Sequence, residues 1–329
     1  AKPRQKAELA PNISGTLTHW VLENALKERK DDFKDLTAEE LAALVDTLVE
    51  QYVAANLPGV TVRMQYLIDR IRRNLVGLLG FIQRDLRQSG FQPAAFELRI
   101  DDRPGDDPDA PRVDPVELDA GGGHTVRIVG TVDRVDAMPH GARTYLRVVD
   151  YKTGGKDFQL KEVYCGLDCQ MLLYLFTLER QAGAQFPGAA AAGVEYLLAD
   201  PAPENIPRAD AEAAGQAGAA VYPLNGLLLD DETVYTAMDP KRTGQFTPLN
   251  YSEKTGRITN AKGRLADPEK LARIRDHLDG LLVQMAQNLY AGNIGAQPLC
   301  SGGRSPCAYC DFRIACPHQD GEDERTVPN

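Results

Sequence analysis

One short stretch constrains this chain more than any other, because a strand pattern in it ends in opposite charges. The residues Arg147-Val-Val-Asp-Tyr-Lys-Thr-Gly154 predict a β-strand followed by a turn. Side chains alternate between the two faces of a strand, so Val148, Asp150 and Lys152 share one face. An unpaired charge on a buried face costs several kcal/mol. The acid and the amine must therefore meet each other, a metal ion or a substrate.

A second acid lies on a neighbouring predicted strand, in Gly130-Thr-Val-Asp-Arg-Val-Asp136. Alternation places Asp133 on one face of this strand, and it places Arg134 and Asp136 on the other. If the two strands pair as a hairpin, Asp133 and Asp150 converge. Two carboxylates suit a hard divalent cation, with water and substrate phosphate as the remaining ligands.

The predicted chemistry is phosphodiester hydrolysis. A bound Mg²⁺ or Mn²⁺ polarises the phosphodiester and acidifies an attacking water. Lys152, two residues beyond Asp150 on the same face, is placed to hold that water and to offset the charge that develops on the phosphorus centre. A strand that ends in D-x-K after a strand that carries Asp133 is far more specific than either pattern alone.

Composition narrows the class of protein. The 329 residues can bury a large core, and the chain has no run of about 18 uncharged apolar residues that would predict a membrane span. No secretory signal opens it, so we expect a cytoplasmic protein. It begins at Ala1 without methionine, and we expect a fragment or a processed chain. A net charge of −10 argues against binding nucleic acid through the global field, but it is compatible with a metal-dependent nuclease.

The order of the periodic patterns predicts an α/β fold, with a small mixed sheet flanked by helices and with helical additions. Helical patterns cover residues 14–30, 37–55, 60–88, 160–181 and 267–289, the second of them opened by the capping box Thr37-Ala-Glu-Glu40. Strand patterns cover residues 96–100, 116–118, 125–136, 144–151 and 193–199. We expect a linker at 1–13, an exposed loop at 101–115 and irregular structure at 200–222.

Three motifs together resemble one family. Gly130-x-x-Asp133, Asp150-Tyr-Lys152-Thr-Gly154 and Gln170-x-x-x-Tyr174 resemble the PD-(D/E)xK nuclease superfamily in its RecB-like branch. The resemblance implies a mixed sheet of about four strands. It implies that Asp133 and Asp150 bind the metal, that the backbone carbonyl of Tyr151 is a further ligand, and that Lys152 is catalytic. Gln170 and Tyr174 match the Q-x-x-x-Y helix motif, whose amide and phenol suit contacts to lysine and phosphate.

The first predicted helix adds a histidine. Gly15-Thr-Leu-Thr-His19 resembles the G-x-x-x-H motif of the same branch, which implies that His19 is a metal ligand. Glu97 resembles an acid often found on the preceding strand, and a plain surface glutamate is an equal alternative. The remaining histidines, at positions 124, 140, 277 and 318, are given no role.

The cysteines gather at the end of the chain, where Cys307, Cys310 and Cys316 form a C-x₂-C-x₅-C array suited to zinc or to an iron–sulfur cluster. The tail resembles that of the nuclease domain in the B subunit of AddAB-type helicase–nucleases, which implies a [4Fe–4S] cluster. In that family a fourth cysteine precedes the G-x-x-x-H helix. No cysteine precedes His19 here, so we expect the fourth ligand to lie before Ala1, with Cys300 as the alternative.

The two remaining cysteines are expected to be structural. Cys165 and Cys169 are four residues apart in the predicted helix at 160–181, and we expect them to be small core residues on one helix face.

The resemblance implies one RecB-like nuclease domain over 1–329, divided into a helical part at 1–90, the sheet and active site at 91–200, helical additions at 201–299 and a cysteine tail at 300–329. It implies a Mg²⁺-dependent deoxyribonuclease, with exonuclease action expected, that acts on ends of single-stranded, unwound DNA in double-strand-break repair, beside the helicase subunit of an AddAB-type heterodimer. No G-x-x-x-x-G-K-[ST] motif occurs, so the motor would lie elsewhere.

Two rivals remain open. One is a free-standing RecB-type exonuclease like those of CRISPR adaptation. The other is a catalytically silent, cluster-stabilised module for DNA binding or scaffolding.

Overall fold

A mixed seven-stranded sheet forms the centre of the computed structural model, which describes residues 11–30, 32–103, 110–155, 157–201, 220–319 and 321–328. The strand order is β2-β1-β5-β6-β7-β8-β9. The strands are β1 (Gln92–Ile100), β2 (Arg112–Val113), β5 (Gly130–His140), β6 (Arg143–Lys152), β7 (Ala189–Leu198), β8 (Leu224–Leu229) and β9 (Leu265–Ala266). The α/β architecture with a central mixed sheet is confirmed, although the sheet has seven strands instead of about four.

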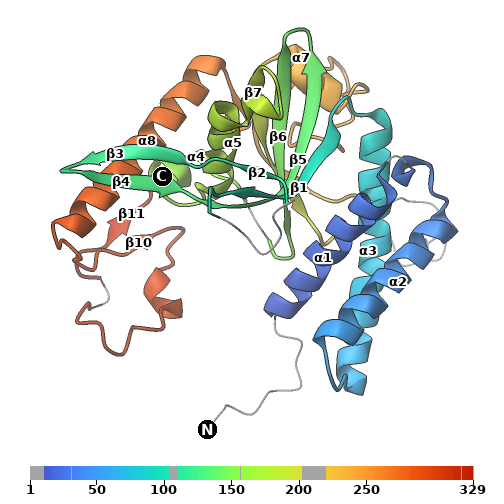
Figure 1. Cartoon of the computed structure of the whole chain (residues 1–329), viewed down its shortest axis with the longest axis horizontal. Coiled ribbons are helices and arrows are strands. Elements are labelled where there is room, and N and C mark those ends of the chain that lie inside the picture. The colour runs from blue at the N-terminus through green and yellow to red at the C-terminus, as the bar shows by residue number, and fades with distance from the viewer. Residues whose placement is uncertain are drawn as a thin grey trace.

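The central strands pair in both antiparallel and parallel directions (Figure 1). β5 is antiparallel to both β1 and β6, whereas β6 and β7 are parallel and are joined through helical structure. A parallel pair needs such a crossover connection, because a tight turn joins only antiparallel strands. β3 (Val116–Gly121) and β4 (His124–Ile128) form a separate antiparallel hairpin that projects from the sheet.

Three helices cover one face of the sheet (Figure 1). They are α1 (Pro11–Arg29), α2 (Ala38–Asn56) and α3 (Val62–Gln88). The capping box at the start of α2 is present, with Thr37 Oγ1 accepting from Glu40 N and the Glu40 carboxylate accepting from Thr37 N. These helices share one buried core with Val149, Tyr151 and Leu197 of the sheet.

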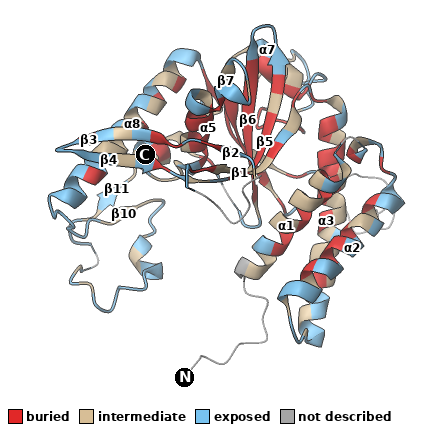
Figure 2. Ribbon diagram, viewed as in Figure 1, coloured by how far each residue is buried: buried red, intermediate tan, exposed pale blue. Residues whose placement is uncertain are grey.

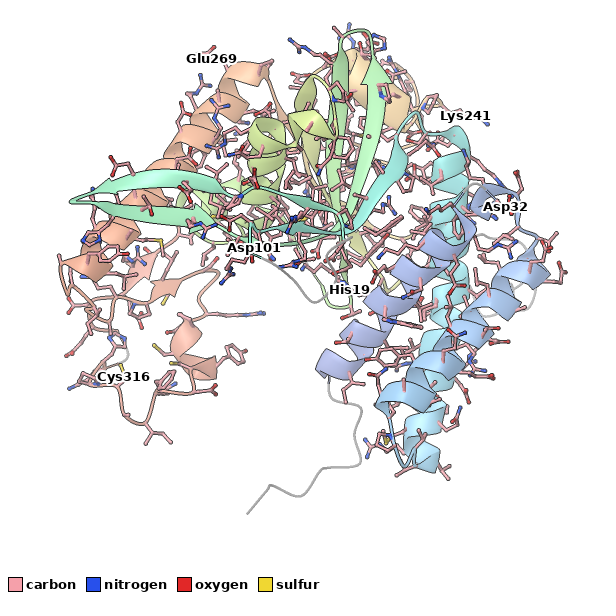
Figure 3. All side chains as sticks on the ribbon, viewed as in Figure 1. His19, Asp32, Asp101, Lys241, Glu269 and Cys316 are labelled. Carbon is pink, nitrogen blue, oxygen red and sulfur yellow. The ribbon has the colours of Figure 1, made fainter. Side chains whose placement is uncertain are left out.

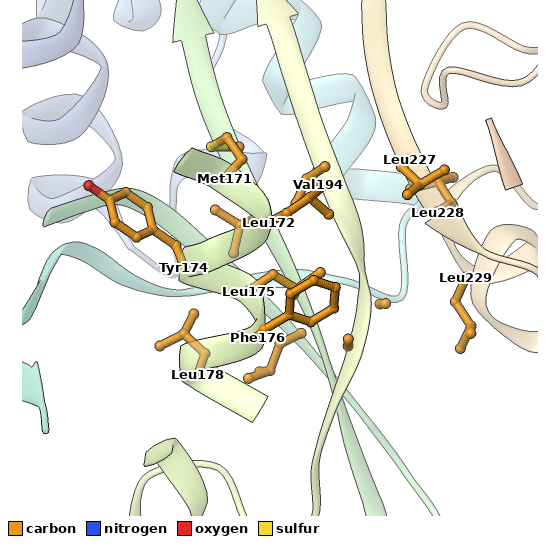
Figure 4. Close-up of a cluster of buried hydrophobic side chains, with 14 of the residues drawn as sticks. Met171, Leu172, Tyr174, Leu175, Phe176, Leu178, Val194, Leu227, Leu228 and Leu229 are labelled. Atoms are coloured by element: carbon orange, nitrogen blue, oxygen red, sulfur yellow. The ribbon is translucent and has the colours of Figure 1, made fainter. Parts of the chain in front are cut away.

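The opposite face packs against α5 (Gln170–Gln181) and α8 (Pro268–Tyr290), with the short helix α7 (Glu232–Met238) nearby. Leu172, Leu175 and Phe176 of α5 are buried against Val194 of β7 and against residues of β8 (Figure 4). Val148 belongs to this core, whereas Val149 belongs to the other. The predicted alternation along β6 is therefore confirmed, and buried positions run down both faces of the sheet (Figure 2).

Several predicted boundaries are wrong. The helix at 160–181 is two helices, α4 (Leu160–Tyr164) and α5, because Gly166 and Asp168 adopt positive φ angles of 90° and 54° between them. The strand at 125–136 is split at Val129 into β4 and β5, and the loop at 101–115 contains β2. The helical additions at 201–299 also contain β8 and β9, which extend the sheet.

Other expectations lie partly outside the described residues. These are most of the linker at 1–13 and of the irregular segment at 200–222. The cysteine tail contains little regular structure beyond a short parallel pair, β10 (Leu299–Cys300) with β11 (Arg325–Thr326). In the described part of the chain, no helix is long and apolar enough to cross a membrane.

Candidate active site

The carboxylates of Asp133 and Asp150 converge where the β5–β6 ladder ends. The last paired residues of that ladder are Arg134 and Val149, and the two acids come one position beyond them on neighbouring strands. Residues at equivalent positions of adjacent strands point to the same face. The hairpin predicted from the sequence is therefore present, and it brings the two acids together.

Helix α1 carries His19 to the same point (Figure 3). Gly15, one turn earlier, lies against Thr153 just after β6, and a Cβ added at Gly15 would be 3.6 Å from Thr153 Oγ1. His19 Nε2 is 2.6 Å from the backbone oxygen of Tyr151, and His19 Nδ1 is 3.0 Å from Asp133 Oδ2. Both ring nitrogens thus face oxygen atoms.

These side chains fit a divalent cation. One ligand atom each from His19, Asp133 and Asp150 lies within 4.8 Å of the others, and no other such group occurs among the described residues. Among the described residues, Asp133 Oδ2 and Asp150 Oδ2 are buried and make no well-aligned hydrogen bond, and their charged neighbours are His19 Nδ1 at 3.0 Å and Lys152 Nζ at 2.5 Å. Buried carboxylate oxygens in this state are costly unless a positive charge completes their surroundings. The carbonyl oxygen of Tyr151, next to His19 Nε2, belongs to the same donor set.

Lys152 closes the other side of the site. Its Nζ is 2.5 Å from Asp150 Oδ2 and 5.8 Å from the centre of the Tyr196 ring. An ammonium over an aromatic face is held by cation–π attraction. The acid and the amine that end β6 therefore do meet, beside the predicted metal position.

The surroundings of Asp133 and Asp150 shift the pKa values of the two acids in opposite directions. Burial and the neighbouring Asp133 carboxylate raise the pKa of Asp150 to about 6. Burial alone would raise the pKa of Asp133 too, but its contact with His19 and the charge of Lys152 lower it instead. Burial by itself lowers the pKa of His19, yet the contact with Asp133 outweighs this and raises it. An imidazolium with both N–H groups facing oxygens satisfies this site when no metal is bound.

Glu97 lies at the edge of the same site. Its backbone has a φ of 47°, which a residue with a side chain seldom adopts, and it sits where the β1–β5 pairing continues past a register shift. Burial, and then the charges of Glu23 and Asp133, raise its pKa to about 7. Of the two alternatives for Glu97, a surface glutamate and an acid of the site, the geometry favours the second.

Comparison with known proteins adds the family. A family model described as "PD-(D/E)XK nuclease superfamily" matches residues 1–317. This chain belongs to the PD-(D/E)XK nuclease superfamily. It is 26% identical over 324 residues to the B subunit of the ATP-dependent helicase/deoxyribonuclease of Clostridium tetani, covering 96% of this chain and 28% of the relative. It is 29% identical over 343 residues to the protein of the same name from Acetivibrio thermocellus, covering 99% of this chain and 28% of the relative. The chain thus spans little more than a quarter of these relatives.

The helix motif of the RecB-like branch lies on α5. Gln170 Nε2 donates to Tyr174 Oη at 3.0 Å, so the two motif residues contact each other as their spacing predicts. Tyr174 is mostly buried and packs on Gly130, where an added Cβ would lie 2.2 Å from Tyr174 Oη. Gly130 therefore lets α5 approach β5 three residues before Asp133. Contacts of this pair to lysine and phosphate remain a prediction.

A second cluster of charges, missed by sequence reasoning, lies on the opposite face of the same strands. Arg134 and Arg147 are almost completely buried, and both bind the fully buried Asp136. Arg147 also pairs with Glu195 of β7 at 2.9 Å and with Asp85 of α3 at 3.4 Å. We call these five residues the buried ion network. The only sequence signal was the presence of charges at positions that strand alternation assigns to the inside.

The buried ion network touches the active site at one residue. Arg134 Nη1 donates to Tyr151 Oη at 2.8 Å, and the guanidinium lies 5.8 Å from the centre of the Tyr151 ring. Tyr151 is thus held at its hydroxyl by the network, while its carbonyl faces His19. This arrangement fixes the backbone of the D-x-K motif.

Cys316 of the tail lies far from His19 in Figure 3. All six described cysteines are free thiols, and those of the tail do not form a close metal-ligating group in the described chain. Burial raises the pKa of the Cys300 thiol, and the charges of Glu324 and Cys307 add to this. The expectation that Cys165 and Cys169 share a helix face is wrong, since Cys165 follows α4 and Cys169 precedes α5. Cys169 does pack against the core, as expected.

Proposed function

We propose that this chain is a Mg²⁺- or Mn²⁺-dependent deoxyribonuclease domain that hydrolyses phosphodiester bonds at the ends of single-stranded DNA. The observation that carries the proposal is the convergence of His19, Asp133 and Asp150 around two buried carboxylate oxygens that lack well-aligned donors, beside Lys152. Two neighbouring carboxylates that share only one lysine and one histidine suit a divalent cation, whose charge offsets both acids.

The residues divide the work by chemistry. His19, Asp133, Asp150 and the carbonyl of Tyr151 would hold the cation, which, when bound, polarises the phosphate and acidifies a water. Lys152 orients the attacking water and offsets negative charge on the phosphorus centre.

The second group of residues acts on the substrate and on Lys152. Gln170 and Tyr174, already hydrogen-bonded to each other, offer an amide and a phenol to phosphate and to that lysine. We propose exonuclease action by this single domain.

We further propose that the domain works within a larger helicase–nuclease in double-strand-break repair in the cytoplasm, beside a helicase subunit. The names of the relatives, each the B subunit of an ATP-dependent helicase/deoxyribonuclease, support this assignment. The net charge of −10 also suits a domain that receives its DNA from a larger assembly instead of attracting it alone.

For the tail we propose a [4Fe–4S] cluster held by Cys307, Cys310 and Cys316, with the fourth thiolate from Cys300 or from a residue before Ala1. The chemistry of three free thiols within ten residues of one another supports the proposal. Visible absorption of an anaerobic preparation, together with iron and sulfide analysis, tests it, and a colourless zinc-containing protein would contradict it.

Two substitutions test the nuclease assignment. Asp150→Ala and Lys152→Ala should each abolish Mg²⁺-dependent cleavage of a labelled single strand in a gel assay, because one removes a ligand and the other the charge beside it. Both variants should keep the circular dichroism spectrum of the unsubstituted protein. Lys161→Ala, at an exposed lysine of α4, is the matched control and should cleave normally. Retained cleavage by either site variant would sink the assignment.

A further inference from the structure

A groove lies between the C-terminal half of α1, the 3₁₀ turn that follows it and strand β1. Its volume is about 880 Å³, within the span of about 300–1,000 Å³ typical of ligand sites. Three lysines line it, Lys27, Lys30 and Lys34, together with an apolar surface that includes Leu26 and Phe96. We call it the lysine groove.

The charge of the lysine groove opposes that of the whole chain. None of the described residues that line it is acidic, although the chain has a net charge of −10. Lys34 Nζ donates to the neutral amide oxygen of Gln92 at 3.1 Å, and Lys27 forms only a partly exposed pair with Glu23 on its own helix. Such contacts contribute little stability and are readily exchanged for a phosphate.

The lysine groove begins beside the active site. Phe96, which lines the groove, is paired with Arg134 of β5, the residue next to Asp133. The groove therefore reaches the strand positions that carry the acids of the proposed metal site.

Helix α1 links the two places. His19, Glu23, Lys27 and Lys30 follow one another at spacings of four, four and three residues, which places them along one stripe of the helix. The helical hydrogen bonding continues to Lys30, whose N–H donates to Leu26 O at 3.0 Å. At a rise of 1.5 Å per residue, Lys27 lies about 12 Å along the axis from His19. The stripe thus begins at His19, the proposed cation ligand, and ends at the ammonium groups of Lys27 and Lys30.

Single-stranded nucleic acid needs the two kinds of surface that meet here. Its phosphates require cations, and its unpaired bases pack on aromatic and apolar side chains, whereas a duplex keeps its bases covered. The lysine groove offers three ammonium groups, the ring of Phe96 and further apolar side chains.

We propose that the lysine groove binds the single-stranded DNA segment next to the phosphate that is cleaved. This inference rests on the proposed nuclease function and adds to it a substrate track with named residues. It predicts that longer strands are cleaved more efficiently than the shortest ones, because only they fill the groove.

The test is the triple variant Lys27→Gln/Lys30→Gln/Lys34→Gln. Binding of a fluorescent oligothymidylate, followed by anisotropy in EDTA, should weaken at least tenfold at low salt. The slope of log K against log [salt] should fall in magnitude by about 2, since each phosphate contact on a single strand contributes about 0.7. With Mg²⁺, the ratio of kcat/KM for the long strand to that for a thymidine dinucleotide should fall at least tenfold.

A matched variant removes the same charge elsewhere. Lys241→Gln/Lys254→Gln/Lys262→Gln alters three exposed lysines outside the groove and should leave the slope and the ratio unchanged. An unchanged ratio in the groove variant overturns the proposal, and so does an equal loss for both substrates, which would place these lysines in folding or at the cation. If the unsubstituted protein cleaves neither substrate with Mg²⁺ or Mn²⁺, the nuclease function itself fails.

Discussion

Strand β5 carries two charge clusters of opposite character on its two faces. On one face Asp133 meets His19 and Asp150, and two of the carboxylate oxygens are buried without well-aligned donors in the described chain. On the other face Asp136 receives both Arg134 and Arg147, at distances of 2.6–2.8 Å. The two acids are three residues apart on one strand and of the same residue type.

The difference distinguishes a charge cluster that stabilises the fold from one that is suited to bind a ligand. Asp136 is completely buried and its charge is matched by guanidinium groups, which keep its pKa low in spite of the burial. The side chains of Asp133 and Asp150 are partly exposed, and burial together with the neighbouring Asp133 carboxylate raises the pKa of Asp150. Asp136 is thus neutralised by two guanidinium groups, whereas the two acids of the site share one lysine and one histidine.

The largest expected effect comes from applying one isosteric substitution to each cluster. Asp136→Asn leaves two buried guanidiniums without their shared carboxylate and should lower the free energy of unfolding by about 3–5 kcal/mol. Asp150→Asn should raise it by about 1–3 kcal/mol in metal-free protein at pH 8, because a neutral amide replaces a disfavoured carboxylate. Urea denaturation in EDTA measures both. Equal destabilisation by the two variants would contradict the distinction.

A smaller effect should appear in the pH dependence of stability. Folding raises the pKa of Asp150 to about 6 through burial and Asp133, and that of Glu195 to about 7 through burial. The folded state therefore binds these protons more tightly than the unfolded state, so stability is present at low pH and is lost as pH rises through each folded pKa. In EDTA the free energy of unfolding should fall by a few kcal/mol between about pH 4 and pH 7.

Saturating Mn²⁺ should abolish the part of this loss that belongs to Asp150, and it should leave the part that belongs to Glu195 of the buried ion network. The Asp150→Asn variant is the control, because its stability should follow the Mn²⁺-insensitive curve alone. A loss of stability that Mn²⁺ does not change at any pH would contradict the assignment of Asp150 to the cation.

The smallest effect should come from Tyr151, the one residue that the two clusters share. Tyr151→Phe removes the hydroxyl that Arg134 donates to, and it should cost about 1–3 kcal/mol of stability because a buried donor is left unpaired. The carbonyl is untouched, so the affinity for Mn²⁺, measured by titration calorimetry, should change only a few-fold. A large loss of affinity would contradict this expectation, because it would show that the buried ion network positions the Tyr151 carbonyl for the cation.

The sequence predicted which candidate site residues lie together, but it missed several element boundaries. Asp133, Asp150 and Lys152 were identified from strand alternation, and His19 from the resemblance of its helix to the G-x-x-x-H motif. The structure brings the four side chains together. The break between α4 and α5 was missed because the apolar pattern continues across the turn. The local signal was Gly166, which follows the C-cap residue Cys165 and adopts the positive φ that commonly ends a helix.

Contacts between residues that are far apart in the sequence could not be predicted. Nothing near Arg147 indicates that Asp85 and Glu195 neutralise it, since those residues arrive from another helix and another strand. The lysine groove was hidden for the same reason, because it exists only after α1 lies beside β1.

The contact between His19 and Tyr151 joins residues that are 132 positions apart, and this separation determines when the contact can form. Closing so long a loop costs entropy that grows with the logarithm of its length, and long-range contacts slow folding. Helix α1 precedes β6 in the chain, so His19 is synthesised before Asp150. The candidate site can therefore form only after β6 has been made and α1 has packed beside the central hairpin.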